Sequence, residues 1–397
     1  MNISNFFKAS RTWALAFKKR HNIVARTITE YTSRSERENA EAILNRTIEF
    51  REEYSKYEAL FPRHLIFNED QTPFNYEIVN KRTLSWRGER DVIVNINSKN
   101  RVSHSYTAQP MISRAGHTVG KLLLCLQEPN GDFGPTVKPR IEQLTQKLGN
   151  IVVYASKSGK MTEELMGHWI FDVFAPAKNS LNPSDDRATE IYDYSNDTIG
   201  NLPADDFAAG SDRFDTMLLL DSWTGQNNKD VIDTLTDYGC RTLVIPPRTT
   251  SDLQPLDTTF NRQFKKFTKR LLERAAFEDL IVNITTREGI IRMHSFIWDQ
   301  FSAPAYRDML RYAWRKTDLD YADTELTKGP PPDMVQQIQF EFDHSHNYEV
   351  ANCTRKAFIK CSHNGRLACL KNFMAGKCNK HPIRGTLAEP ETNFGNF

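Results

Sequence analysis

Four short apolar runs constrain the fold of this chain more than any other feature of its sequence. Each has the length of one strand and ends at a polar residue or a proline, at residues 65–67, 122–126, 217–220 and 243–245. Runs that are apolar at every position are typical of interior strands covered on both faces. Between them the sequence predicts a helix over 162–174, because Thr162 is a good N-cap and Leu165, Trp169 and Val173 recur at helical spacing. We therefore expect a mixed α/β domain.

Composition excludes a protein with a membrane-spanning helix and shows which segments are strongly charged. The 397 residues contain 52 Lys plus Arg and 50 Asp plus Glu, with no run of about 18 apolar residues that could span a bilayer. Residues 1–40 and 351–388 are basic, whereas residues 179–213 carry eight acids against two arginines and read as a solvated acidic insertion. The start has no signal-peptide pattern, so we expect reduced thiols or metal ligands among the six cysteines rather than disulfides.

Three carboxylates follow strand signals in a way that suggests one site. The strand candidates at 65–67 and 217–220 lead to Asp70 and Asp221, and the end of a strand can hold a carboxylate rigidly at the rim of a sheet. Asp and Asn also simply terminate strands, which is the alternative interpretation of each. Asp257 opens a long helix whose core face is Phe260, Phe264, Phe267 and Leu271. Because it precedes Phe264 by seven residues, we expect Asp257 to point inward, unless it only caps the helix dipole.

Basic residues beside aromatic ones predict contacts with nucleic acid at two places. The long helix presents one basic face, formed by Arg262, Lys265, Lys266, Lys269 and Arg270. Near the start, Trp13 and Phe17 can pack a helix while its basic residues reach phosphates; these are Arg11, Lys18, Lys19 and Arg20. The alternative for the first helix is a basic helix that docks on the rest of the protein.

The C-terminal tail is rich in thiols and imidazoles. Six potential zinc ligands fall within 29 residues, namely Cys353, Cys361, His363, Cys369, Cys378 and His381. A short basic tail with few large apolar residues can hardly bury a core, so we expect a zinc-stapled module, with a loosely ordered tail as the alternative. The expected ligands are Cys361, Cys369, Cys378 and His381, with Cys353 and His363 as alternates. Cys125 and Cys240 lie in or beside strand runs and are expected to be core thiols.

Several segments together resemble the DDE transposases of the mariner and pogo type. Residues 67–73 (FNEDQTP), 218–222 (LLLDS) and 246–257 (PPRTTSDLQPLD) are similar to the three acidic blocks of that family, and 35 residues separate Asp221 from Asp257. Residues 156–164 with Trp169 are similar to the helix before the second acid. The resemblance covers about residues 61–275 and implies a ribonuclease H-like fold.

The resemblance also implies the chemistry of the acids. Asp70, Asp221 and Asp257 would be catalytic and would hold Mg²⁺ or Mn²⁺, since hard cations prefer carboxylate oxygens and paired ions assist phosphoryl transfer. Glu69 and Asp252 are rival acids. Strand alternation turns Glu69 away from Asp70, and Asp252 precedes the helix start, so both rank below.

The two ends of the chain are similar to further parts of the family. Residues 7–21 resemble the last helix of a centromere-protein-B-like helix-turn-helix, whose earlier helices we expect to be missing because the chain begins just upstream. The tail is similar to the cysteine-rich C-terminal domain of some pogo-type transposases. The expected organisation is a partial helix-turn-helix segment (1–27), a helical linker (28–60), a DDE catalytic domain with an acidic insertion at 179–213 (61–325), a linker (326–349) and a cysteine- and histidine-rich zinc-binding tail (350–384).

The sequence thus predicts a transposase, or a protein derived from one, that binds double-stranded DNA in the nucleus and catalyses metal-dependent strand cleavage and strand transfer. We expect a homodimer, and neither a membrane nor a small molecule as partner. The alternative is a domesticated or decayed DNA-binding protein without catalytic activity. A ribonuclease H-like nuclease acting on RNA hybrids is a third possibility, for which the sequence has no feature of its own.

Overall fold

The computed structural model describes residues 10–23, 40–76, 105–181, 214–277, 284–320 and 357–374. Contacts divide the chain into two compact units, Met1–Asn45 and Arg46–Phe397. In the smaller unit, helix α1 (Arg11–Arg20) begins after Ser10, whose hydroxyl accepts a hydrogen bond from the Trp13 amide. Trp13 and Phe17 stack with ring centroids 5.0 Å apart, and both side chains are exposed. The rings therefore pack on each other within the helix and leave apolar surface open to solvent.

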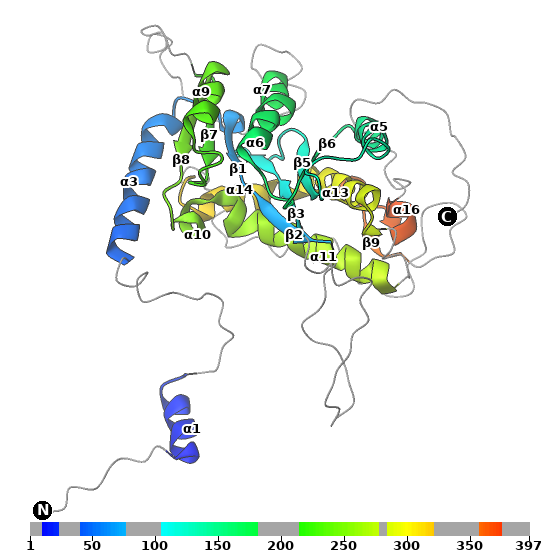
Figure 1. Cartoon of the computed structure of the whole chain (residues 1–397). Helices are drawn as coiled ribbons and strands as arrows, with labels where there is room; N and C mark the ends of the chain where they lie inside the picture. The colour runs from blue at the N-terminus through cyan, green and yellow to red at the C-terminus, as the bar shows by residue number, and fades with distance from the viewer. Residues whose placement is uncertain are drawn as a thin grey trace, which may run out of the picture. The chain divides into compact units, whose positions relative to one another are not determined.

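The larger unit is a mixed α/β structure (Figure 1). Its strands are β1 (Ile66–Glu69), β2 (Thr72–Asn75), β3 (Ser105–Gln109), β4 (Met111–Ser113), β5 (Leu122–Gln127), β6 (Ile151–Ser156), β7 (Thr216–Leu220), β8 (Cys240–Val244), β9 (Ile359–Lys360) and β10 (Leu367–Ala368). The longer helices include α3 (Ala40–Glu58, which belongs to this unit from Arg46 on), α5 (Lys138–Leu148), α6 (Glu163–Trp169), α7 (Ala175–Ser180), α9 (Lys229–Asp237), α11 (Asn261–Phe277), α13 (Arg287–Phe301) and α14 (Arg307–Lys316). Short helical segments are η1 (Arg63–Leu65), η2 (Ile170–Phe174), α10 (Thr250–Leu253), η5 (Leu256–Phe260), η6 (Pro304–Tyr306) and α16 (Leu370–Met374).

Two four-stranded sheets, ordered β4-β1-β7-β8 and β2-β3-β5-β6, meet where the chain passes from β1 to β2 and from β3 to β4. The antiparallel pair Glu69–Met111 at the end of one sheet continues as the pair Thr72–Ala108 at the start of the other. Across the combined sheet the strands follow in the order β8, β7, β1, β4 in one part and β2, β3, β5, β6 in the other, with β2 continuing from β1 and β3 leading into β4. Strands β7 and β8 run parallel to β1. All four predicted strands are confirmed, the last of them beginning earlier than expected, at Cys240.

Helices cover both faces of this sheet, as the uninterrupted apolar strands predicted. Ile66 and Leu219 belong to a core that also includes residues of α11, α13 and α14, whereas Phe67 and Leu218 belong to a second core with residues of α6, η2 and α9. Figure 1 shows α6 and α7 on one side of the strands and α11 and α13 on the other. The alternation along β1 and β7 therefore decides which helices each side chain faces.

The predicted helix after β6 is confirmed and has a bulge in it. The Thr162 hydroxyl accepts a hydrogen bond from the Leu165 amide, which fixes the start of α6. The next turn, η2, is π-helical, and α7 continues from it. Leu165, Trp169 and Val173 are all buried, so the apolar face expected from their spacing does face the core.

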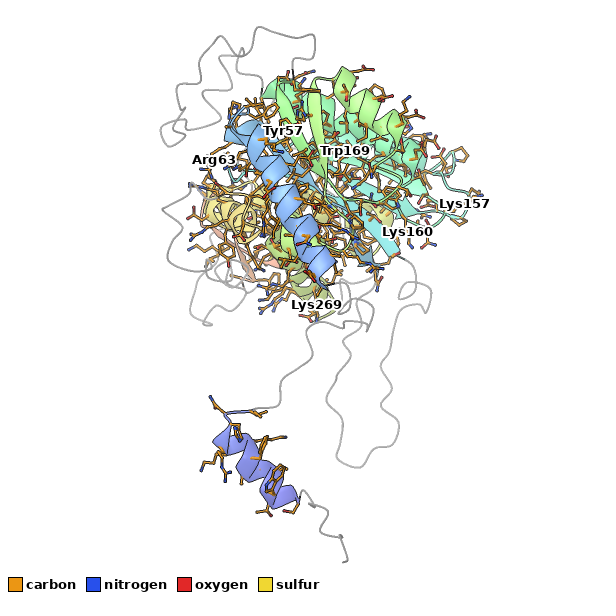
Figure 2. The ribbon with its side chains drawn as sticks, turned by 90° about the vertical axis from the view of Figure 1, so that its left-hand side faces the viewer. Tyr57, Arg63, Lys157, Lys160, Trp169 and Lys269 are labelled. Carbon is orange, nitrogen blue, oxygen red and sulfur yellow. The ribbon has the colours of Figure 1, made fainter. Side chains whose placement is uncertain are left out.

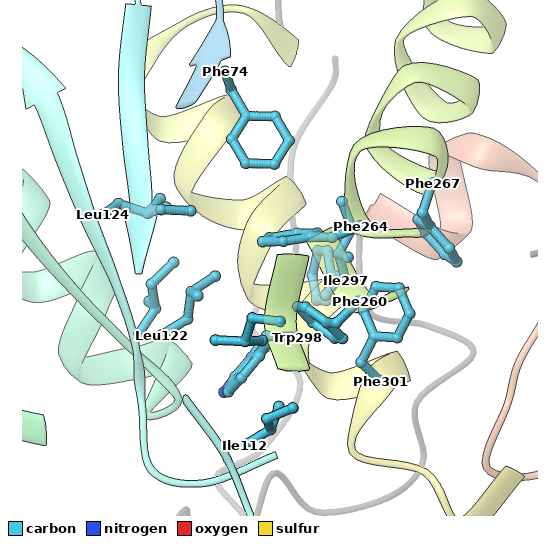
Figure 3. Packing of buried hydrophobic residues seen from close by; sticks show 14 of the residues in the cluster. Phe74, Ile112, Leu122, Leu124, Phe260, Phe264, Phe267, Ile297, Trp298 and Phe301 are labelled. Carbon is cyan, nitrogen blue, oxygen red and sulfur yellow. The ribbon is translucent and has the colours of Figure 1, made fainter. Parts of the chain in front are cut away.

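The core face predicted for the long helix is also confirmed (Figure 3). Phe260, Phe264 and Phe267 are buried and surround Phe301 of α13, with ring centroids 5.0, 6.0 and 5.7 Å from it. Phe264 also lies edge-on to Phe74 of β2 at 5.0 Å. This cluster therefore ties α11 to the sheet and to α13.

The described part of the tail packs on this same core. Strands β9 and β10 form an antiparallel pair, and Phe358, Ile359 and Phe373 belong to the core that includes α13. The rings of Phe296 and Phe373 lie 6.0 Å apart. Our premise that the tail has too little apolar surface to bury is therefore wrong for residues 357–374, because the tail uses the surface of α11 and α13 as its core.

Among the described helices, none combines the length and the apolar character needed to cross a membrane.

Replacing Phe264 by Ala should lower the free energy of unfolding by about 3–5 kcal/mol, because it leaves a cavity among at least four rings. Chemical denaturation followed by circular dichroism measures this change. Lys265→Ala is the control, since Lys265 is exposed on the next position of the helix and should change stability by less than about 0.5 kcal/mol. Similar losses in both variants would contradict this account of the core.

Candidate active site

Asp70 lies between β1 and β2, where the antiparallel pairing with β4 and β3 is interrupted. Its amide donates to the Pro110 carbonyl at 3.4 Å, but Pro110 has no N–H to donate in return, so the ladder breaks between β1 and β2. The Asp70 side chain is only 8% exposed. By strand alternation it lies on the same face as Ile66, which is the face covered by α11 and α14.

Asp257 comes to Asp70 from the start of the long helix. One amide nitrogen, Nδ2 of Asn261, donates to Asp70 Oδ2 at 2.6 Å and to Asp257 Oδ1 at 2.9 Å. Asn261 is buried, and its Oδ1 has no hydrogen-bond partner within the described part of the chain. Two carboxylates from segments far apart in the sequence therefore meet at a single neutral donor.

The expectation that Asp257 points inward is wrong, because its side chain is exposed. The prediction assumed α-helical geometry from Asp257 to Phe264. Instead η5 is a π-helical turn, in which the Asn261 amide bonds the Leu256 carbonyl five residues back. The wider turn shifts Asp257 to the rim of the site, where it faces solvent while it contacts Asn261.

Asp221 follows β7 directly and is half-buried. Its Oδ1 accepts the Ser222 amide at 2.7 Å. Gln226 donates to the Asp221 carbonyl at 3.3 Å and accepts from Gln71 at 3.4 Å, which connects the loop after β7 to the break after β1. Asp221 thus lies at the end of a strand, as the sequence indicated, and the structure pairs this strand with β1, which leads to Asp70.

Crowding of acids affects the protonation of this site. Burial raises the pKa of Asp70 well above its usual range, and the charges of Asp257 and Glu69 raise it further. Burial also raises the pKa of Glu69 to about 8, with a further contribution from Asp221 and an opposing one from the hydrogen bond of Gln109. Without a cation, both buried carboxyls therefore hold protons more strongly than exposed acids do.

The two rival acids have other surroundings than Asp70. Glu69 accepts a hydrogen bond from Gln109 Nε2 at 2.5 Å, and Gln109 also lies 3.4 Å from the sulfur of Met166 in α6. Glu69 therefore turns to the α6 side of the sheet, as alternation predicted. Asp252 is exposed on α10.

The acidic side chains described above do not by themselves form a complete set of metal ligands. Across the described ranges, no group of three or more His, Cys, Asp or Glu side chains is arranged to hold a metal ion. Asp70 and Asp257 are nevertheless joined through Asn261, and Mg²⁺ is commonly bound through only one or two carboxylates, with water and phosphate completing its shell. The pair is therefore compatible with a hard divalent cation.

Sequence reasoning missed the amide side chains around the acids. They are Asn68, Gln71, Gln226, Gln254 and Asn261. Two signals were available: Asn68 is two residues before Asp70 and thus on the same strand face, and Asn261 is four residues after Asp257, one helical turn away. Neither signal by itself says what the amide bonds.

The basic residues predicted to bind DNA lie on surfaces of both units. On α1, Lys18, Lys19 and Arg20 are exposed, and the side chain of Arg11 lies outside the described ones. On α11, Arg262 and Lys265 are exposed, while Lys266, Lys269 and Arg270 are half-buried. Lys269 pairs with Glu273 at 3.6 Å. Figure 2 shows Lys157 and Lys160, which were not predicted, at an edge of the larger unit away from Arg63.

The structure describes only part of the predicted zinc ligand set. Cys361 directly follows β9, Cys369 directly follows β10, and both are buried. The Cys361 sulfur lies 3.7 Å from Gln300 Nε2, and the Cys369 sulfur accepts the Asn372 amide at 3.5 Å. The alternate His363 contacts the Asp299 carbonyl at 2.7 Å. Cys353, Cys378 and His381 lie outside the described residues, so the zinc site stays a prediction.

Comparison with known proteins finds structural neighbours only. Neither a protein-family model nor a curated protein matches the sequence. The Mos1 transposase paired-end complex with the left transposon end has a TM-score of 0.38 at 13% identity, covering 77% of this chain and 66% of that chain. The Mos1 strand transfer complex has a TM-score of 0.40 at 13% identity with the same coverage. The chain thus matches slightly less than two thirds of the Mos1 chains, and at TM-scores below 0.5 the function has to be argued from its own residues.

Replacing Glu69 by Gln should remove a pH dependence of stability. The folded protein keeps the Glu69 proton up to about pH 8, whereas an unfolded chain releases it near 4.5, so stability falls as pH rises between these values. With metal chelated, wild type should lose about 1.4 kcal/mol of unfolding free energy per pH unit relative to Glu69→Gln across this window. Denaturation at several pH values measures the difference, and a constant difference would contradict it.

Proposed function

We propose that this chain is a transposase, or derives from one, and that it binds double-stranded DNA and catalyses metal-dependent strand cleavage and strand transfer. The observation that carries the proposal is the meeting of Asp70 and Asp257 at one amide of Asn261, with Asp221 directly after the strand that pairs with β1. These are the three acids that the resemblance to mariner and pogo transposases selects. A mixed sheet in which β7 and then β8 run parallel to β1 supports the ribonuclease H-like fold of the proposal.

Asp70 and Asp257, with Asp221 from the neighbouring strand, would hold Mg²⁺ or Mn²⁺. Such a cation, when bound, activates the attacking oxygen and stabilises the leaving oxygen in phosphoryl transfer. The protein supplies the carboxylates on rigid elements and keeps Asp70 largely out of water. Because ligands must lose their protons, cation binding should strengthen as pH rises through the elevated pKa of Asp70.

Asp70→Asn, Asp221→Asn and Asp257→Asn should each reduce Mg²⁺- or Mn²⁺-dependent nicking of plasmid DNA by more than about 100-fold. Each change removes an anionic ligand, and even the loss of a partner of a metal ligand typically costs about 10- to 100-fold. Circular dichroism spectra should remain those of wild type.

Asp252→Asn is the matched control, because Asp252 is an exposed acid on α10, within a few residues of Asp257 in sequence. It should nick DNA at the wild-type rate. Wild-type protein that binds DNA but does not nick it would instead support the decayed DNA-binding protein, and full activity in Asp257→Asn would show that the third acid was assigned wrongly.

The DNA-binding part of the proposal rests on exposed positive charge. Arg262 and Lys265 are exposed on α11, the helix whose first residue bonds both carboxylates. Phosphate contacts of this kind supply affinity that depends on salt and little on sequence. Binding to duplex DNA, a location in the nucleus and assembly as a homodimer all belong to the proposal, as does a structural zinc ion held by Cys361, Cys369, Cys378 and His381.

Replacing both Arg262 and Lys265 by Ala should flatten the salt dependence of duplex binding. The slope of log affinity against log salt should decrease in magnitude by about 1.8, because each lost phosphate contact removes about 0.9. Fluorescence anisotropy over a range of salt concentrations measures the slope. Lys138→Ala with Lys147→Ala removes two exposed charges from α5 and should leave it unchanged. Equal slopes for all three proteins would exclude α11 from the DNA surface.

A further inference from the structure

Asn68 occupies an unusual place for an amide. It lies in the middle of β1, an interior strand, and its side chain is 0% exposed. Its neighbours on the same strand face are the apolar Ile66 and the acid Asp70. Burying an amide costs free energy unless its donors and acceptor are all hydrogen-bonded. The hydrogen bonds of the Asn68 side chain therefore indicate its structural role.

The Asn68 amide bonds the backbone beside each of the three acids. Its Oδ1 accepts the Leu256 amide at 3.0 Å, directly before Asp257. Its Nδ2 donates to the Leu219 carbonyl at 3.3 Å, two residues before Asp221, and to the Glu69 carbonyl at 3.3 Å, directly before Asp70. One side chain thus reaches all three segments, and both its donor and its acceptor are used.

The hydrogen bond from the Leu256 amide to Asn68 caps the start of η5. The first amides of a helix have no partner within the helix, and η5 has no side-chain cap at its own start, where Pro255 precedes Leu256. Asn68 supplies that cap from a strand 188 residues away in the sequence. The start of η5, and with it Asp257, is therefore fixed to β1 rather than to its own loop.

Gln254 makes a second tie between the same two segments. It is buried, and its Nε2 donates to the Glu69 carbonyl at 3.1 Å. The carbonyl beside Asp70 therefore accepts from side chains on both β1 and the loop before η5. This arrangement limits how far Asp257 can move from Asp70.

We infer that Asn68 is a positioning residue of the acid site, assisted by Gln254, and that it sets the affinity of the three carboxylates for a divalent cation. The inference rests on the proposed function. Only a residue that contains both a donor and an acceptor at this length can make the three bonds: Leu has neither, and Asp has no donor when ionised. Asn68 touches none of the reacting atoms and acts by holding the acids together before the cation arrives.

Calorimetric titration of the full-length, DNA-free protein with Mn²⁺ tests this. Asn68→Leu should raise the dissociation constant at least about 10-fold, as loss of a supporting hydrogen bond does at other metal sites. The matched control is Asn150→Leu: Asn150 also joins two elements by an amide, bonding Ser295 of α13 at 2.9 and 2.6 Å, but far from the acids in sequence. Both variants should lower the melting temperature without metal, whereas the control should keep the wild-type dissociation constant.

Gln254→Met covers the case in which Asn68→Leu does not fold. It keeps the side-chain length, removes only the bond to the Glu69 carbonyl, and should raise the dissociation constant about 3-fold or more. A wild-type dissociation constant in a folded Asn68→Leu or, failing that, in Gln254→Met overturns the inference alone, as does an equal rise in Asn150→Leu. Wild-type protein that binds no Mn²⁺ overturns the proposed function and the inference with it.

Discussion

The broken pairing at Pro110 is the constraint on which the candidate site depends. A proline cannot donate to the strand opposite it, so the ladder between β1 and β4 stops before Asp70 and the ladder between β2 and β3 begins at Thr72. The same interruption divides one mixed sheet into two four-stranded parts. Asp70 therefore lies between two paired strands, β1 and β2, while its own backbone is outside the regular strand pairing. Its carboxylate faces the start of α11, where it accepts from Asn261.

Burial of the strands on both faces has a second consequence, which is electrostatic. Acids that end such strands lie close to apolar cores, and burial raises the pKa of both Asp70 and Glu69. The two residues are adjacent but face opposite helices, so their partners differ: Asn261 bonds Asp70 and Gln109 bonds Glu69. Alternation along one strand thus directs Asp70 to Asn261 and Asp257, and Glu69 to the α6 side of the sheet, where the charge of Asp221 also acts on it.

Neutral amide side chains join the separate segments of this site. Asn261 joins two carboxylates, Asn68 joins three backbone segments, and Gln226 joins the loop after β7 to Gln71. An amide suits this role because it carries a donor and an acceptor without a charge that would need a counterion in the interior. The cost of burying these groups is offset where their hydrogen bonds are made, which is beside the acids.

The sequence by itself determined the local features: strand runs, the capped start of α6, the phenylalanine face of α11 and the order of the acids. These follow from periodicity and from capping chemistry, which act over a few residues. Tertiary structure decided the rest. The π-helical turn η5 moved Asp257 to the rim, and contacts across 188 and 191 residues, from Asn68 to Leu256 and from Asn261 to Asp70, set the site. Such bonds depend on which distant segment occupies the neighbouring space, and no local pattern encodes that. The tail is a second example, because its own apolar residues are too few to form a core. In the structure they pack against α13, which completes the core.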